Sequence, residues 1–145
     1  MEKYMKIALK EAIKAYKKNE VPIGAVIVKN GKVIAKAHNK KENKNIATCH
    51  AEILAINKAC KKLKNWRLLD CTLYVTVEPC LMCCGAIIQS RIDNVIYGTE
   101  NKNYGAITST CESLSKYNVK IIKNVCHDEC ENIMKMFFKN KRKSL

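Results

Sequence analysis

Three side chains that bind metals well occur at a spacing that lets them meet. His50 stands two residues before Glu52, and Cys80 and Cys83 form a Cys-x-x-Cys pair after a later apolar run. Residues three apart on a helix share a face, so both sulfurs can reach one ion. Two thiolates and one imidazole, with a fourth position left for water, are typical of catalytic rather than structural zinc. We therefore expect His50, Cys80 and Cys83 to hold one Zn²⁺ per chain, with Glu52 beside it.

The local sequence permits this arrangement without requiring it. Pro79 is suited to the first turn of a helix, and a helix N-terminus favours the thiolate forms of Cys80 and Cys83. His50 and Glu52 are turned about 200° apart on a helix, so periodicity alone does not place them on one face. A long Glu side chain at a helix start can nevertheless curl back toward its neighbour.

Each part of the pattern also has an ordinary interpretation. A single His is more often a satisfied polar residue than a ligand, and Glu52 or Glu78 alone would be a solvated helix residue. A Cys-x-x-Cys pair also occurs in redox sites. A thioredoxin-like redox site is disfavoured here. In such sites the Pro normally lies between the two Cys and no His-x-Glu comes before them, whereas this chain has Pro79 before the first Cys and His50-x-Glu52 upstream.

The other cysteines are expected to be thiols. The chain has nine Cys, and this odd count without an export signal argues against a disulfide framework. Cys84 is predicted to be core, since it points about 100° away from Cys83 on the helix. A second metal group at Cys126, His127 and Cys130 lacks a fourth partner nearby, so packing is favoured there.

Composition limits the class of protein. The chain has 145 residues, enough for one domain over residues 1–145, with a basic tail at about 139–145. The net charge of +14 favours a polyanion such as nucleic acid, although general Lys richness would give the same excess. No apolar signal core or membrane-length run is present, which predicts a cytoplasmic protein without a membrane partner.

The pattern of apolar residues predicts the elements that must position the candidate site. Helices are expected over residues 3–19, 50–64, 79–90 and 128–141, and strands over 24–37 as a hairpin, 72–77, 94–98 and 119–123. Asn30-Gly31 is the hairpin turn, because this dipeptide accepts the positive φ angles of a tight turn.

The expected order is helix, hairpin, helix, strand, helix, strand, helix, strand, helix. It therefore also places a helix between the strands at 94–98 and 119–123. Strands joined through helices favour parallel pairing, whereas the hairpin must be antiparallel. The sequence thus predicts an α/β fold with a mixed sheet and helices on both faces.

The pattern His-x-Glu followed by Pro-Cys-x-x-Cys is the signature of zinc deaminases that act on nucleobases. The chain resembles the bacterial tRNA-specific adenosine deaminase family along nearly its whole length, in "EVPIGAVIV", "HN" at 38–39, "HAEI", "NWRLLDCTLYVTVEPCLMCCGAIIQSRIDNVIYGT" and "FFKNKRK". The resemblance implies a homodimer with a three-layer α/β/α sandwich around a five-stranded mixed sheet. It implies hydrolytic conversion of adenosine to inosine at the wobble position of tRNA anticodons, with Glu52 moving protons.

The same resemblance assigns roles to further residues. Asn39 resembles the Asn that hydrogen-bonds the flipped base, although it could instead be a turn residue that closes the hairpin. Ala51 and Pro79 would line the pocket through backbone groups. The RNA loop would be held by an exposed ring and three cations near the end of the chain: Phe138, Lys139, Lys141 and Arg142. Phe137 is expected to be buried.

One position departs from the family pattern. Asn101 falls where the family usually has an Asp beside the target nucleotide, in "TENKNYGA". An Asn lacks the anionic acceptor, so we expect weaker dependence on the ribose 2′-OH and some activity on single-stranded DNA. Glu100 could instead supply the carboxylate.

Two other functions remain open from the sequence. The same zinc pattern would serve a deaminase of a free base, nucleoside or nucleotide, of guanine, cytosine or cytidine type, but a small substrate needs neither the Lys excess nor the basic tail. A non-catalytic RNA-binding or structural zinc protein is the third interpretation. It is disfavoured because a structural site needs no Glu52.

Overall fold

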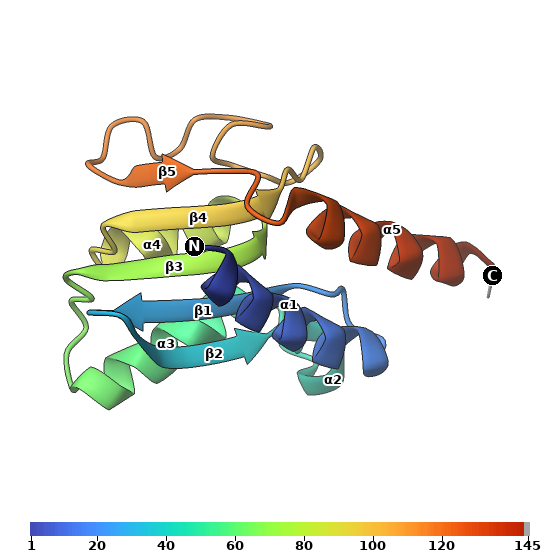
Figure 1. Ribbon diagram of the computed structural model, residues 1–145, viewed down its shortest axis with the longest axis horizontal. Helices are drawn as coiled ribbons and strands as arrows, with labels where there is room; N and C mark the ends of the chain where they lie inside the picture. The colour runs from blue at the N-terminus through green and yellow to red at the C-terminus, as the bar shows by residue number, and fades with distance from the viewer. Residues whose placement is uncertain (144–145) are drawn as a thin grey trace.

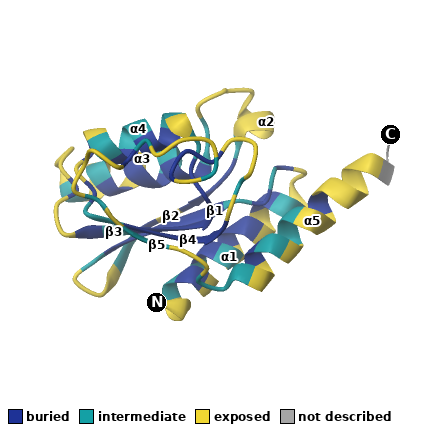
Figure 2. Ribbon diagram, turned by 90° about the horizontal axis from the view of Figure 1, so that it is seen from above, coloured by how far each residue is buried: buried dark blue, intermediate teal, exposed yellow. Residues whose placement is uncertain are grey.

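The computed structural model describes residues 1–143 and has one five-stranded sheet with helices on both faces (Figures 1 and 2). The strands are β1 (Gly24–Lys29), β2 (Lys32–His38), β3 (Cys71–Val77), β4 (Asn94–Thr99) and β5 (Lys120–Ile122). The helices are α1 (Glu2–Lys17), α2 (Lys41–Lys44), α3 (Ala51–Leu63), α4 (Leu81–Gln89) and α5 (His127–Lys143). The predicted α/β/α sandwich with a mixed sheet is confirmed.

Strand pairing follows from the connections. The sheet order is β2-β1-β3-β4-β5, with β1 antiparallel to both neighbours and β3, β4 and β5 parallel. Asn30 and Gly31 join β1 to β2 at φ angles of 50° and 74°, as the hairpin prediction requires. The carboxyl ends of the parallel strands β3 and β4 lie at one edge of the sheet, where the candidate site is built.

The sheet carries an apolar core on each face. Alternate residues of β1 point to opposite sides, so Ala25 and Ile27 face α3 and α4, while Val26 and Val28 face α1 and α5. Figure 2 shows the two helix pairs on opposite sides of the buried sheet. Sheet and helices therefore form one rigid support for the segments that follow the strands.

A buried carboxylate holds the segment that leads from β2 to α3. Glu20 is fully buried and accepts hydrogen bonds from the backbone N–H groups of Glu42 at 3.0 Å and Asn43 at 2.6 Å. Both donors belong to α2, a short helix that the sequence patterns did not predict. Glu20 thus orders the chain immediately before His50.

One prediction about secondary structure was wrong. The connection between β4 and β5 contains turns and no α-helix, because its backbone bonds to a buried carboxylate and to itself locally. The last helix was predicted to end at Lys141, and α5 continues to Lys143. Phe137 packs this helix against Tyr16, with ring centroids 6.1 Å apart. Residues 144 and 145 lie outside the described residues.

Within residues 1–143, no helix combines the length and the apolar character needed to span a bilayer.

Candidate metal centre

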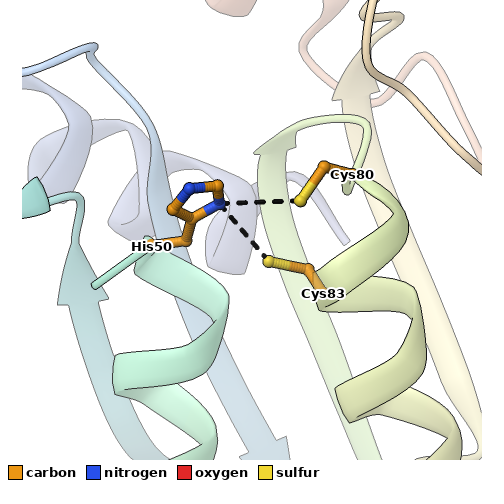
Figure 3. A group of neighbouring side chains, drawn as sticks. All are labelled: His50, Cys80 and Cys83. Carbon is orange, nitrogen blue, oxygen red and sulfur yellow. Dashed lines mark hydrogen bonds between the residues drawn. The ribbon is translucent and has the colours of Figure 1, made fainter. Parts of the chain in front are cut away.

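Two helix N-termini bring the candidate ligands together. His50 is the residue before α3, Cys80 the residue before α4, and Cys83 lies in the first turn of α4. Their side chains point into the space between the two helices (Figure 3). The Nδ1 atom of His50 is 3.6 Å from the Cys80 sulfur and 3.7 Å from the Cys83 sulfur. Pro79 and Cys80 therefore precede the helix, which begins two residues later than predicted.

These separations fit a zinc ion. Zn–S bonds of about 2.3 Å and Zn–N bonds of about 2.0–2.1 Å at a tetrahedral angle place nitrogen and sulfur about 3.6 Å apart. The three ligand atoms all lie within 4.8 Å of one another. Hydrogen bonding from Cys83, with a further contribution from His50, lowers the pKa of Cys80 to about 4, whereas sharing that proton and burial raise the pKa of Cys83. The pair thus already carries one thiolate for a cation.

Glu52 lies beside this group in the first turn of α3. Its side chain is buried, and burial is the main cause that raises its pKa to about 7. The Oε1 atom of Glu52 has no hydrogen-bond partner among the described residues. A buried oxygen without a partner is costly unless a ligand or water meets it, so Glu52 is not the solvated residue of the alternative interpretation.

The sequence patterns missed the role of Glu78. This residue directly follows β3, is 2% exposed, and accepts hydrogen bonds from the segment after β4. Burial by itself raises the pKa of Glu78, but hydrogen bonds led by the Ser109 hydroxyl outweigh it and hold the pKa below its usual value. Its place at the end of a buried strand, directly before Pro79, was the only available signal.

The residues predicted to contact substrate also hold local structure. Asn39 is buried; its Oδ1 accepts from the Lys41 N–H at 3.3 Å and its Nδ2 donates to the Val21 carbonyl at 3.4 Å. Ala51 is fully buried at the start of α3. Both hydrogen bonds of Asn39 are long and therefore weak, so the side chain can exchange them for stronger hydrogen bonds to a ligand.

Pro79 and Asn101 belong to the same wall of the site. The Pro79 carbonyl accepts from the Ala106 N–H at 2.9 Å. The Asn101 side chain accepts from the Tyr104 N–H at 3.2 Å, and its own N–H donates to Glu78 at 3.2 Å. Asn101 thus closes a turn in the loop that borders the motif.

Lysines crowd the segment that follows Asn39, a feature that the sequence patterns did not single out. Burial lowers the pKa of Lys40, and the cations of Lys58, Lys18 and Lys44 lower it further. Lys41 and Lys44 are exposed on α2. This rim gives the approach to His50 a positive potential that attracts anions.

The residues predicted to bind RNA lie on α5, which extends beyond the sheet (Figure 1). Phe137 is buried as expected, whereas Phe138 is 43% exposed. Lys139 and Arg142 are exposed, and the Lys141 ammonium lies 5.6 Å from the Phe137 ring centroid. None of these residues belongs to the ligand group.

Cys84 and Cys130 are buried, as expected for core residues. His127 contacts acidic neighbours, with its Nδ1 3.1 Å from Asp128. Among residues 1–143, the group with metal-ligand spacing is His50, Cys80 and Cys83.

Comparison with known proteins identifies the family. The model of the MafB19-like deaminases matches residues 1–142. The tRNA-specific adenosine deaminase of Streptococcus pyogenes serotype M1 is 46% identical over 143 residues, which cover 96% of this chain and 84% of that relative. The chain belongs to the tRNA-specific adenosine deaminase family of MafB19-like deaminases.

Solved structures agree with this family assignment. A structure from a study of A-to-I editing by tRNA:A34 deaminases at the wobble position matches with a TM-score of 0.87 and 39% identity, over 90% of this chain and 97% of that chain. The guanine deaminase from Bacillus subtilis matches with a TM-score of 0.65 and 44% identity, but over only 68% of this chain and 64% of its own. The tRNA deaminase structure therefore shares more of this deaminase's architecture.

Proposed function

We propose that this protein converts adenosine to inosine at the wobble position of a tRNA anticodon, releasing ammonia. The observation that carries the proposal is the buried Glu52 oxygen beside His50, Cys80 and Cys83, which has no partner within residues 1–143, in a chain of this family. Residues 1–145 would act as one catalytic domain in the cytoplasm, where tRNA takes part in translation.

His50, Cys80 and Cys83 would hold one Zn²⁺ per chain. When bound, zinc at such a site supplies a water nucleophile at neutral pH. The donor set and the 3.6 Å and 3.7 Å separations support zinc over harder cations, which prefer oxygen ligands.

Glu52 would act as the general base and then the general acid. Its carboxylate accepts one proton from the attacking water and delivers it to a purine ring nitrogen, and then transfers the remaining proton of the new hydroxyl group to the departing amine. Water adds to the carbon that bears the amine, and the carbon–nitrogen bond breaks. Burial of Glu52 excludes bulk solvent from this transfer.

Four residues would form the base pocket around that carboxylate. Asn39 would exchange its long hydrogen bonds for contacts to the flipped base, and Ala51 and Pro79 would contribute backbone groups. Asn101 would border the target nucleotide from the loop after β4. Ala51 follows His50 and Pro79 precedes Cys80 in the chain, which supports the roles of these two residues.

Phe138, Lys139, Lys141 and Arg142 would hold the anticodon loop, the ring by stacking and the cations on phosphates. We expect the double change Lys139→Gln and Arg142→Gln to weaken binding of an anticodon hairpin. The slope of log affinity against log salt should become shallower by about 1.4, since two phosphate contacts are lost and each single-strand contact contributes about 0.7. Fluorescence anisotropy over a salt series measures this slope.

The matched control is Lys61→Gln with Lys62→Gln, which removes the same charge from the exposed, far end of α3. Equal loss of slope in both double variants would contradict a specific role for the end of α5.

Asn101 predicts some activity on DNA. Asn101 has an amide where the family usually has an anionic acceptor. Removing the 2′-OH from the substrate should therefore lower the deamination rate of this enzyme less than that of an Asn101→Asp variant. Inosine formation in matched RNA and DNA anticodon hairpins gives the ratio for each protein. Inosine in RNA with none in DNA would end this prediction.

We also propose that the protein is a homodimer, as its family resemblance implies. The apolar patch of Trp66, Leu69, Ile88 and Tyr117 is a suitable face: Trp66, Leu69 and Tyr117 are 51%, 49% and 49% exposed, and Leu69, Ile88 and Tyr117 line one hollow. We expect Leu69→Asp to give monomers in sedimentation velocity. Ile13→Asp, exposed on α1 on the opposite face, should remain dimeric. A monomeric parent protein would refute the proposal.

The proposed function is tested by sequencing transcribed tRNA after treatment with the zinc-loaded protein. We expect A to be read as G at the wobble base of one or more tRNAs, and not after treatment with Glu52→Gln. Guanine and cytidine are assayed in parallel for ammonia release. Ammonia from either one with unchanged tRNA would indicate the small-substrate deaminase instead, and RNA binding without any turnover would indicate a binding protein.

A further inference from the structure

The carboxylate of Glu78 collects donors from a segment more than twenty residues away. Its Oε2 accepts from the N–H groups of Ile107, Thr108 and Ser109 at 3.0, 2.8 and 3.1 Å. Its Oε1 accepts from the Asn101 N–H at 3.2 Å and from the Ser109 hydroxyl. Both oxygens are thus saturated by one loop, residues 101–110.

That loop is also attached to the metal motif by backbone groups. The Ala106 N–H donates to the Pro79 carbonyl at 2.9 Å, and Gly105 forms a bridge with Cys80. A Cβ atom at Gly105 would overlap the Glu78 carboxyl group and the Asn101 carbonyl, so glycine permits the close approach. The loop therefore lies directly on the residues that lead into α4.

We propose that Glu78 is a positioning residue that keeps residues 101–110 preformed as one wall of the substrate pocket, before RNA binds. The proposal rests on the proposed function for its substrate, but its central claim concerns the order of the loop. Glu78 does not touch the reacting atoms. It acts through Asn101 and Gly105, which border the nucleotide and the metal motif.

Preformation predicts a specific kinetic signature. Without the carboxylate, the loop must become ordered when RNA binds. The apparent dissociation constant then equals the intrinsic one divided by the fraction of molecules whose loop is already ordered. Glu78→Gln keeps the side-chain shape but presents an amide donor to N–H groups that are themselves donors. We expect KM for an anticodon hairpin to rise about tenfold to a hundredfold, with kcat changed less than about threefold, because saturating RNA restores the wall.

The experiment compares Glu78→Gln with Glu112→Gln, which removes the same charge from an exposed residue near this loop. Gly105→Ala tests the same contact without changing Glu78, and Gly85→Ala adds the same methyl group where no atom lies within 4 Å. Zinc content and hydrogen exchange of residues 101–110 are measured for each protein. Glu78→Gln and Gly105→Ala should exchange faster in this loop while retaining zinc, and the two controls should match the parent.

The outcomes separate the possible roles. A lower kcat with unchanged KM would mean that the Glu78 variant contains fewer correctly folded molecules, each with normal affinity for RNA. That result would overturn the proposal. Unchanged exchange in residues 101–110 of Glu78→Gln would overturn it as well. The exchange measurement does not depend on turnover, so a parent protein inactive on RNA would refute the proposed function while the ordering of the loop is still tested.

Discussion

Replacing Glu52 with glutamine should reduce turnover by about a thousandfold or more while leaving the metal in place. General acid–base catalysis contributes roughly 10²–10⁴ to rate, and Glu52 is the acid or base that lies beside the ligand group. Glutamine fills the same buried volume but cannot accept and return a proton. Zinc should stay bound, because the imidazole and both sulfurs are unchanged.

The measurement pairs single-turnover deamination of an anticodon hairpin with zinc analysis of the same sample. Glu112→Gln, an exposed carboxyl-to-amide change, should keep the parent rate. If zinc were lost from Glu52→Gln in parallel with activity, the carboxylate would be supporting the metal rather than moving protons. Full activity in this variant would remove the central step of the proposed function.

Cys83→Ala should lower zinc content from about one ion per chain to a small fraction and abolish turnover. The change removes one of three protein ligands and leaves the fully buried position without a thiolate. Thermal unfolding should also become insensitive to added zinc, since an ion that binds only the folded state stabilises it by mass action.

The adjacent Cys84→Ala is the matched control. Cys84 is equally buried on the same helix, but its sulfur lies 3.7 Å from the Pro79 carbonyl and outside the ligand group. It should keep its zinc and its activity, with a modest loss of stability from the small cavity. Retention of zinc by Cys83→Ala would show that the ion is held elsewhere, and would end the assignment of His50, Cys80 and Cys83.

The ligand group could be predicted because its geometry is mostly local. Cys80 and Cys83 come from one helix start, and a helix fixes residues three apart on one face. His50 comes from a second helix start, and its meeting with the sulfurs depends on β2 and β3 running in the same direction, each antiparallel to β1, so that α3 and α4 begin at the same edge of the sheet. Boundaries were less predictable, since α4 begins two residues later than expected, after Pro79 and Cys80, and α5 ends two residues later than expected, at Lys143.

The loops around the site could not be predicted in the same way. A helix was expected between β4 and β5, but that connection turns repeatedly because Glu78 binds four of its N–H groups and the Ser109 hydroxyl. Glu20 orders α2 by the same device. The presence of a Glu in the sequence does not reveal from which distant backbone N–H groups its carboxylate will accept hydrogen bonds.

The layered fold, the hairpin at Asn30-Gly31 and the residues able to bind zinc follow from periodicity, turn chemistry and ligand spacing, which act over a few residues. The folded chain was needed to show that Glu52 is buried with an oxygen that has no partner in the described part of the chain, and that Glu78 holds the facing loop. Burial and long-range hydrogen bonds arise when separate segments meet, and the free energy of a carboxylate depends on what surrounds it there.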